Sequence, residues 1–348
     1  MKLTTCQSDL DHALRTIAPA VGVRSSHPIL DCCLITASNG AMAITGFNLD
    51  LGITVTCPAA IDTAGSACLP YRLLAGIVSR MDSGEPIELS DGALSAASGS
   101  YGLAVCDAAD YPTMPVVEAP GAELDLTTGI RACMVAVSSD ASKQLLTGIH
   151  LGSGFMEATD GHRLMRVPVD LPDSTDLVLP AATARLLQDR TVTLAAAGGQ
   201  AVIDAGDGIT IYSRILDGTY PNVAALLPTS FEHTLELDRH RLVRALERIA
   251  MIAEAHNSVV QLLIGDKGTM IISAEADANS GTEAIKYTGT SGKLALAFNV
   301  HYLLDGLKAM RGHDTVTLSA NAPTTPVVLQ PAGESGMTYL VMPVQIRQ

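Results

Sequence analysis

The chain has 348 residues, of which 47% are hydrophobic, and its formal net charge is −14. This length suggests two or three domains, and the hydrophobic content excludes a disordered chain. No apolar run reaches the roughly 18–20 residues of a membrane helix, and Asp9 and Asp11 interrupt the N-terminal segment where a signal peptide would be apolar. We therefore expect a soluble, cytoplasmic protein. An acidic protein is a poor partner for nucleic acid unless its basic residues are concentrated on one surface.

Three amphipathic segments begin after a polar residue of the kind that caps helices. At the first of them Asp11 follows Ser8 by three residues, in a capping-box pattern. The pairs of cap and expected helix are Ser8 with residues 9–20, Thr127 or Thr128 with residues 129–137, and Asp238 with residues 239–253.

Three other segments begin after an apolar residue followed by Pro or Asn, both of which favour a helix start. The expected helices follow Leu69-Pro70 and end near Met81, follow Leu179-Pro180 and end near Asp189, and follow Phe298-Asn299 and end before Gly312.

The two kinds of helix alternate with a period of about one third of the chain, which indicates an internal repeat. Tyr111-Pro112 recurs as Tyr220-Pro221. Alternating apolar and polar residues with Gly, Asp and Asn turns predict short strands between the helices, for example at residues 43–55, 191–211 and 269–287. The pattern predicts an α+β protein of three similar domains, at residues 1–118, 119–229 and 230–348.

A polar turn between two strand-like runs stands out at residues 156–168. Asp160-Gly161 is a strong hairpin signal, and His162 and Arg163 follow at once. The corresponding stretches of the other repeats, residues 44–53 and 272–279, have neither His nor Arg. The cluster is therefore either a simple hairpin turn or part of a ligand site.

Basic residues concentrate in six helix windows, which are the six expected helices with their flanking residues. Most acidic residues lie between these windows. In the window 238–254, Arg241, Arg244 and Arg248 share one helix face, and apolar residues such as Leu242 and Leu246 share another. A single basic helix face is usually just an ordinary solvent-exposed surface and not a binding site. All six windows contain more basic than acidic residues taken together, and they include Arg239 and the whole of residues 126–145. This shared bias predicts a basic helical surface suited to sequence-independent phosphate contacts.

The usual signatures of catalysis and metal binding are absent from the sequence. The run from Gly289 to Lys293 resembles a phosphate-binding loop, but its glycine spacing is wrong and Leu294 stands where Ser or Thr is needed. Asp160 and His162 could supply half of a metal site or an acid–base pair, and a hydrolase or lyase that uses them with Arg163 stays open as an alternative.

The seven cysteines all lie in the first 133 residues, and no C-x-x-C pair occurs. A zinc site or a disulfide framework would show paired spacing. The sequence instead predicts reduced thiols, most of them buried.

Five short motifs together resemble the bacterial sliding clamps, the beta subunits of DNA polymerase III. The motifs are residues 158–164 (Ala-Thr-Asp-Gly-His-Arg-Leu), 27–30, 217–221, 298–300 and 339–343. The resemblance runs the whole length of the chain. It implies a non-catalytic processivity factor, a head-to-tail homodimer closed into a ring around duplex DNA, with helices lining the hole. No cofactor or metal is expected.

The resemblance also implies a pocket for short hydrophobic peptides of the polymerase, the clamp loader and repair proteins. The residues carried over for the pocket are Leu146, Thr159, Gly161, His162, Arg163, Leu164, Pro221, Leu226, Asn299, Tyr302, Leu340, Val341, Met342 and Pro343. Ala225 and Val344-Gln345 depart from the family pattern, which leaves the peptide preference open.

For DNA, the resemblance implies a contact at Arg24 and, more loosely, at Lys143 and Gln144. The charge pattern adds Arg72, Arg80, Arg185, Arg241, Arg244 and Arg248. We expect the dimer contact between an edge strand near residues 98–106 and the third domain around residues 251–260. A scaffold of the same fold that does not bind DNA is the remaining alternative.

Overall fold

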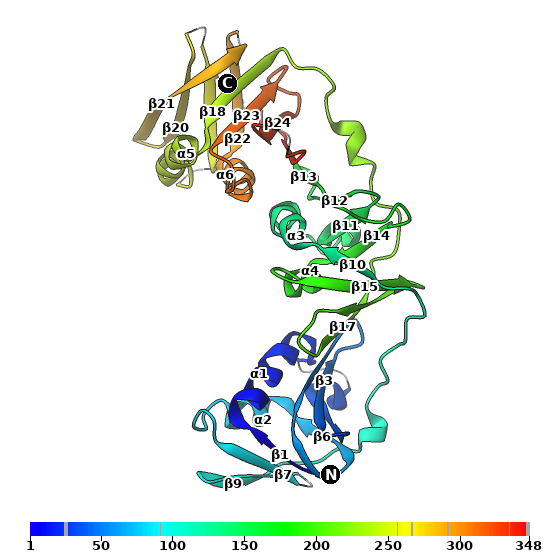
Figure 1. The fold of residues 1–348 in the computed structure, drawn as a ribbon. Coiled ribbons are helices and arrows are strands. Elements are labelled where there is room, and N and C mark those ends of the chain that lie inside the picture. The colour runs from blue at the N-terminus through cyan, green and yellow to red at the C-terminus, as the bar shows by residue number, and fades with distance from the viewer. Residues whose placement is uncertain are drawn as a thin grey trace. The chain divides into compact units, whose positions relative to one another are not determined.

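The computed structural model describes the chain in seven stretches: residues 1–23, 27–90, 92–255, 257–265, 267–290, 292–333 and 335–345. Its contacts divide the chain into two compact units. One comprises Met1–Leu124 with Asp189–Ile215, and the other Asp125–Gln188 with Leu216–Gln348. Each unit combines antiparallel sheets with helices (Figure 1), as the α+β prediction requires. No helix in the described stretches is long and apolar enough to cross a membrane.

The first unit contains two antiparallel sheets. The five-stranded sheet has the order β5 (Ala60–Thr63), β1 (Lys2–Cys6), β7 (Pro86–Ser90), β8 (Ala93–Ala96) and β9 (Gly99–Gly102). The eight-stranded sheet has the order β10 (Ala122–Asp125), β15 (Thr191–Ala197), β16 (Gln200–Asp204), β17 (Ile209–Arg214), β4 (Leu51–Pro58), β3 (Ala41–Phe47), β2 (Cys32–Ser38) and β6 (Gly65–Pro70).

Helix α1 (Gln7–Ile17) packs on β3 and β4 and buries Leu10 and Leu14. The prediction that Ser8 caps this helix is wrong, because the helix already begins at Gln7 and Cys6 is its N-cap. Long-range bonds fix this start: the backbone N–H of Gln7 donates to the Glu85 carbonyl (2.8 Å) and its side chain to the Val78 carbonyl (2.8 Å).

Helix α2 (Tyr71–Val78) follows Pro70 as expected and ends a few residues before Met81. Its last turn is closed by Arg80, whose guanidinium donates to the Gly76 carbonyl at 2.6 Å.

The second unit contains one twelve-stranded antiparallel sheet. Its order is β14 (Leu177–Pro180), β11 (Gly148–Gly152), β12 (Phe155–Thr159), β13 (Arg163–Pro168), β25 (Thr338–Val341), β24 (Val327–Pro331), β23 (Thr315–Ala320), β18 (His233–Asp238), β21 (Asn279–Thr290), β20 (Thr269–Ala276), β19 (Val259–Ile264) and β22 (Leu294–Asn299).

The helices of this unit are α3 (Thr127–Cys133), α4 (Ala181–Leu186), α5 (Arg239–Ala253) and α6 (Val300–Ala309). Helices α5 and α6 lie side by side on the sheet (Figure 1). Two predicted caps are confirmed: the Asp238 carboxylate accepts from the Arg241 N–H (2.8 Å), and the Asn299 side chain accepts from the His301 N–H (2.9 Å).

The expected helix across residues 126–145 is too long. Helix α3 ends at Cys133 and a single 3-10 turn follows at Met134–Ala136. A second 3-10 turn, Gln144–Thr147, lies beyond a non-helical stretch. Lys143 and Gln144 are therefore not on an α-helix, because Asp140 closes a turn there by accepting from the Ser142 N–H at 2.9 Å.

Candidate partner-binding cleft and basic helix surface

The hairpin predicted at Asp160-Gly161 is present between β12 and β13. The Asp160 carboxylate accepts from the backbone N–H groups of His162 (2.8 Å) and Arg163 (3.0 Å), and Gly161 has a φ of +94°. Such a φ favours glycine, because a Cβ would be strained there. The Thr159 hydroxyl closes the turn by donating to the Arg163 carbonyl (2.6 Å). Asp160 therefore acts as a turn residue.

Strand β13 pairs directly with β25, so the middle of the chain meets its C-terminal part. Leu164 lies opposite Leu340, and Arg163 lies opposite Val341. One step further, the Met342 N–H donates to the His162 carbonyl at 2.9 Å. The two sets of carried-over residues, which are far apart in the sequence, thus lie on adjacent strands of one sheet.

An apolar cluster forms where these strands meet the 3-10 turn Val223–Leu226. Leu164, Val223 and Leu340 are buried, and Leu227 and Met342 are partly buried against them. Leu226 is the residue of this turn that the resemblance assigns to the pocket, but it is 60% exposed and lies outside the cluster. Val223 and Leu227 were missed, although their spacing of four residues is the helical signal for one shared face.

Tyr302 on α6 supports the polar side of the hairpin. The His162 ring stacks on it, with 6.2 Å between ring centroids, and the Arg163 guanidinium lies 4.4 Å from its centroid. Arg163 also donates to Asp305 (2.6 Å) and Asp160 (3.0 Å). Burial alone would lower the pKa of Arg163, but these carboxylates raise it above its ordinary value. Arg163 is therefore a fixed cation in the wall of the cleft.

The remaining carried-over residues hold the surrounding segments. Leu146 is half-buried in the turn Gln144–Thr147, which Lys143 links to the hairpin by donating to the Asp160 carbonyl (3.4 Å). Asn299 caps α6, and Val341 is buried. Pro343 precedes Val344, whose N–H donates to the Ala297 carbonyl at 2.8 Å and fastens the tail beside β22. Pro221 is exposed before the turn Val223–Leu226.

The hairpin does not have the geometry of an acid–base pair. The Asp160 carboxylate is occupied by two backbone N–H groups and by Arg163, and its contact with His162 is to the backbone. Across the described stretches of the chain, no three His, Cys, Asp or Glu side chains are grouped so that they could hold a metal ion.

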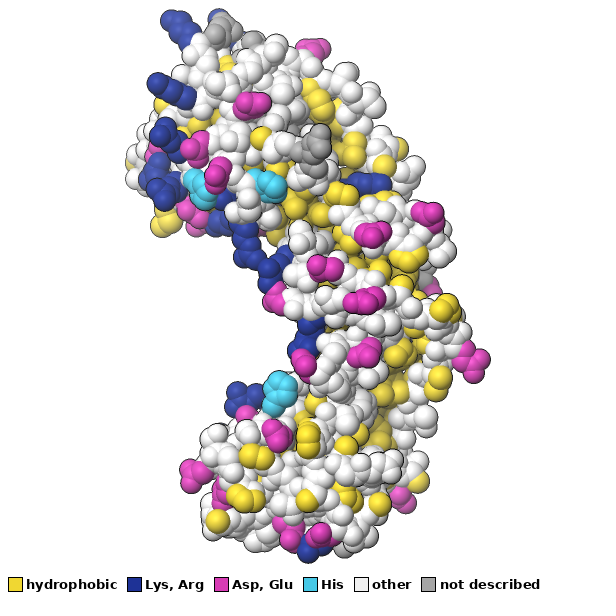
Figure 2. Space-filling view, in the orientation of Figure 1, with side chains coloured by type: hydrophobic (Ala, Val, Ile, Leu, Met, Phe, Trp, Pro, Cys, Tyr) yellow, Lys and Arg dark blue, Asp and Glu magenta, His cyan; other side chains and the backbone are white. Residues whose placement is uncertain are grey.

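Helix α5 presents the predicted basic face. Arg241, Arg244 and Arg248 are exposed, opposite a buried face that includes Leu242 and Leu246. Figure 2 shows Lys and Arg side chains gathered on the side of the second unit where Figure 1 places α5 and α6.

Two arginines of this helix are tied to protein groups. Arg239 is only 5% exposed and is wrongly included in the basic surface, because it donates to the His313 carbonyl (2.6 Å) and the Leu307 carbonyl at the end of α6. Arg248 makes two bonds to Glu283, at 2.6 and 3.0 Å, which raise its pKa.

The other predicted phosphate contacts are distributed over both units. Arg72 on α2, Arg80 just beyond it, and Arg185 on α4 are exposed, as are Lys143 and Gln144. Arg24 lies outside the described residues.

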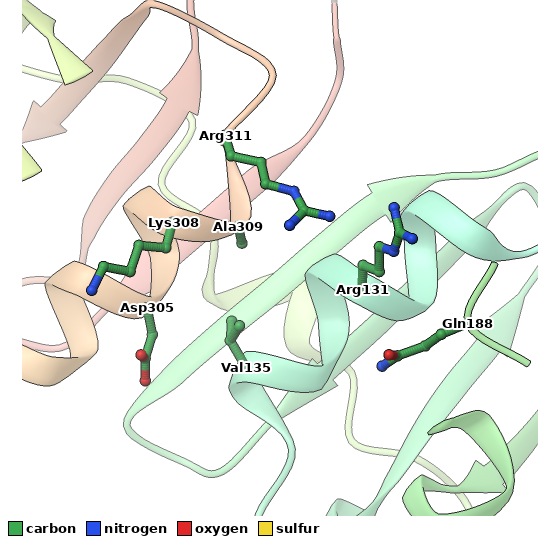
Figure 3. A pocket seen from close by; sticks show the side chains of 7 residues that line it. All are labelled: Arg131, Val135, Gln188, Asp305, Lys308, Ala309 and Arg311. Carbon is green, nitrogen blue, oxygen red and sulfur yellow. The ribbon is translucent and has the colours of Figure 1, made fainter. Parts of the chain in front are cut away.

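A pocket of about 440 Å³ opens between α3 and α6. Figure 3 shows the guanidinium groups of Arg131 and Arg311 pointing toward each other across it, with Gln188 below them. Two of its charged neighbours have partners elsewhere, since Lys308 pairs with Glu247 (2.8 Å) and Asp305 with Arg163.

Comparison with known proteins accounts for this arrangement. Residues 1–115 match the family model of the DNA polymerase III beta subunit, N-terminal domain, and residues 224–345 match that of its C-terminal domain. A "Beta sliding clamp" of Synechococcus elongatus is 37% identical and covers 100% of both chains. The crystal structure of the Bacillus subtilis DNA polymerase sliding clamp has a TM-score of 0.92 at 24% identity, over 100% of both chains. A Bartonella birtlesii sliding clamp bound to griselimycin has a TM-score of 0.91 at 23% identity, over 99% of this chain and 100% of that one.

The fold and the family matches define a protein of the sliding-clamp class. The chain belongs to the DNA polymerase III beta subunit family, whose members are beta sliding clamps and act as processivity factors.

Proposed function

We propose that this chain encircles duplex DNA as a ring of two copies, each with three clamp domains at residues 1–118, 119–229 and 230–348, and tethers the replicative polymerase through a hydrophobic peptide. The carrying observation is the pairing of β13 with β25, which sets Leu164 beside Leu340 at an apolar cluster. Family membership supports the same function.

The proposed peptide site is the cleft around this cluster. Met342 and Leu227 are partly buried, so each leaves apolar surface for a ligand. The exposed His162 ring, held on Tyr302, supplies a polar rim. An apolar groove with a few fixed polar groups suits a short peptide with hydrophobic anchors. The carriers of such peptides would be the polymerase, the clamp loader and repair proteins.

The proposed DNA surface is the basic side of the helices. Its best-supported members are Arg241 and Arg244, which are exposed on α5. Contacts of this kind neutralise phosphates without reading bases, and they favour sliding. The remaining proposed contacts are Arg24, Arg72, Arg80, Lys143, Gln144, Arg185 and Arg248.

For the ring contact we propose β9 with residues 251–260, of which His256 lies outside the described residues. Strand β9 is an edge of its sheet, and Met251 is 74% exposed. A Met251→Asp variant would then sediment as a monomer at concentrations where the parent is a dimer; an unchanged dimer would remove this contact from the proposal.

The peptide site is tested by the affinity of a hydrophobic clamp-binding peptide for the parent and for Met342→Ala. We expect a loss of about tenfold or more, because Met342 is an apolar wall of the cleft. Met81→Ala is the matched control, since Met81 is also partly exposed but lies in the other unit. Equal affinities for the parent and Met342→Ala would refute the site.

The net charge of −14 favours one alternative, an interaction scaffold of the same fold that does not bind DNA. The alternative is tested with circular and linear duplex DNA. A clamp, loaded by its cognate loader, stays on circles and leaves linear ends, whereas a scaffold is retained on neither.

A further inference from the structure

The hairpin of the proposed peptide cleft has a structural counterpart in the first unit, between β3 and β4. In the hairpin of the cleft, Thr159 lies opposite Leu164 across a turn of residues 160–163. In the counterpart, Phe47 lies opposite Gly52 across a turn of residues 48–51. The two hairpins therefore have the same length and register, and Gly52 occupies the position of Leu164.

The turn of the second hairpin is closed by the same kind of bonds. The Asn48 side chain accepts from the N–H groups of Asp50 (3.1 Å) and Leu51 (2.8 Å). Asp160 makes the same two bonds in the cleft, to the second and third residues after it. A side chain that bonds its own backbone in this way fixes the turn. Strands β4 and β13 therefore begin from equivalent turns.

The strand that pairs with each hairpin is also equivalent. Strand β17 pairs with β4 so that Tyr212 lies opposite Gly52. Leu340 holds this position in the second unit, opposite Leu164. Beyond the pair, the Arg214 N–H donates to a carbonyl of the turn at 2.8 Å, which matches the 2.9 Å bond between the C-terminal tail and the turn of the cleft. We call the place where β3, β4 and β17 meet the first junction; it has the same construction as the proposed cleft.

The side chain of Met114 fills the first junction. It packs against the apolar cluster that contains Phe47 and Tyr212, whose rings meet edge to face with 5.5 Å between their centroids. A Cβ added to Gly52 would overlap the Met114 sulfur, so this side chain lies directly over the glycine. A leucine in that position, as in the second unit, would leave no room for it. The space that Met114 occupies therefore exists because residue 52 is a glycine.

Met114 enters the first junction from a segment without regular structure. It follows Tyr111 by three residues, just as Val223 follows Tyr220 at the proposed cleft. Val223 belongs to a 3-10 turn, whereas residues 112–118 form neither helix nor strand. An irregular segment that inserts one flexible apolar side chain into a site between strands resembles a bound peptide with a hydrophobic anchor.

We propose that Met114 is a built-in occupant of a second peptide cleft, and that it restricts each chain to one partner peptide. The opened first junction would accept a peptide whose anchor is apolar and unbranched at Cβ, such as Met or Leu. Because Met114 is tethered, it competes at an effective concentration on the order of millimolar, and a free peptide at micromolar concentration does not displace it. The inference rests on the proposed cleft at Leu164 and Met342, since the likeness to that cleft identifies the first junction as a peptide site.

The test counts the peptides bound per chain and maps where they bind. The probe is a hydrophobic clamp-binding peptide with a Leu or Met anchor and a photoreactive group. In calorimetric titration the parent should bind one peptide per chain, crosslinked only within the second unit. Met114→Ala should bind two, and the added crosslink should map to the strands around Phe47 and Tyr212.

Two control variants should keep the count at one. Met114→Leu replaces the side chain with another apolar group that fills the first junction. Val116→Ala shortens a neighbouring side chain that is 83% exposed, so it should not open the junction. A second peptide on Val116→Ala would show that shortening any apolar side chain of this segment has the same effect, and it would overturn the assignment to Met114.

The remaining outcomes separate a failure of this inference from a failure of the proposed function. One peptide on both the parent and Met114→Ala would overturn the inference and leave the proposed cleft intact. No peptide on the parent would refute the proposed cleft and this inference with it. A crosslink to Phe47 or Tyr212 in the parent would show that Met114 does not close the first junction, and this measurement does not depend on the folding of any variant.

Discussion

Arg163 on β13 and Asp305 on α6 are joined by a hydrogen bond of 2.6 Å, although they come from distant parts of the chain. The bond fixes the hairpin to the helix, and it places the Asp305 carboxylate at the edge of the pocket between α3 and α6. One charged pair therefore connects the proposed peptide cleft with the pocket between α3 and α6.

Removing Arg163 should destabilise the second unit. Its side chain is 13% exposed, so Arg163→Ala leaves two carboxylates without their cation, and we expect a loss of about 2–4 kcal/mol in the free energy of unfolding. Arg214→Ala is the control, because its pair with Asp50 is exposed and should contribute less than about 0.5 kcal/mol. Equal losses in denaturant titrations would contradict this assignment.

Gly306→Ala should separate α6 from the sheet. A Cβ at this position would lie 2.3 Å from the ring of Tyr339, which is fully buried and cannot move aside. We expect a cost of roughly 1–3 kcal/mol in stability. Gly76→Ala on α2 meets nothing closer than 3.8 Å and should instead gain about 0.5–1 kcal/mol. Thermal unfolding of both variants measures the contrast, and a stabilised Gly306→Ala would refute the close contact.

His150 should make stability depend on pH. Burial opposes its charge, but hydrogen bonds to Glu157 (2.9 Å) and Asp176 (3.0 Å) outweigh burial and raise its pKa above its ordinary value. A raised folded pKa means that the stabilisation is complete below the unfolded pKa and is lost as pH rises through the folded one. Stability should therefore fall on going from about pH 6 to pH 8.

The variant His150→Gln separates this effect from other titrations. It should remove that part of the pH dependence of unfolding, whereas His12→Gln, on the exposed face of α1, should leave it unchanged. An identical pH profile for the parent and His150→Gln would show that His150 has the same pKa in the folded and unfolded chains.

Arg244 and Arg248 should differ in their effect on DNA binding. Within the described stretches no ion pair involves Arg244, whereas Arg248 is held by Glu283. Arg244→Ala should lower the slope of log K against log salt by about 1, and Arg248→Ala by less. Fluorescence anisotropy with duplex DNA over a salt series measures both slopes. A larger change for Arg248→Ala would show that its pair with Glu283 opens on DNA.

Local chemistry explains what the sequence predicted correctly. Asp238 and Asn299 cap their helices, and Asp160-Gly161 turns its hairpin, because each acts on backbone groups two or three residues away. Such short-range bonds can be inferred from side-chain type alone.

Contacts between distant segments explain the errors. Gln7 begins α1 because Glu85 and Val78 accept its hydrogen bonds, so Ser8 is not the cap. Arg239 is drawn inward by free carbonyls at the end of α6. Neither partner can be identified from the local sequence, and both depend on the finished packing.

The candidate site likewise contains some residues that the sequence predicted and others that it did not. The motif around His162 and the tail at Met342 are recognisable by type, and the structure brings them together. Val223 and Leu227 complete the apolar cluster, but their loop has no motif of its own. The convergence of Arg131 with Arg311 needed the relative placement of α3 and α6.

The pairing of β13 with β25 also determines when, during synthesis of the chain, the proposed cleft can form. Strand β25 is the last strand of the described chain to be synthesised. Until it is present, the edge of β13 that pairs with it stays unpaired. A chain that stops before β25 lacks Leu340 and Met342, so it would be missing one wall of the proposed cleft.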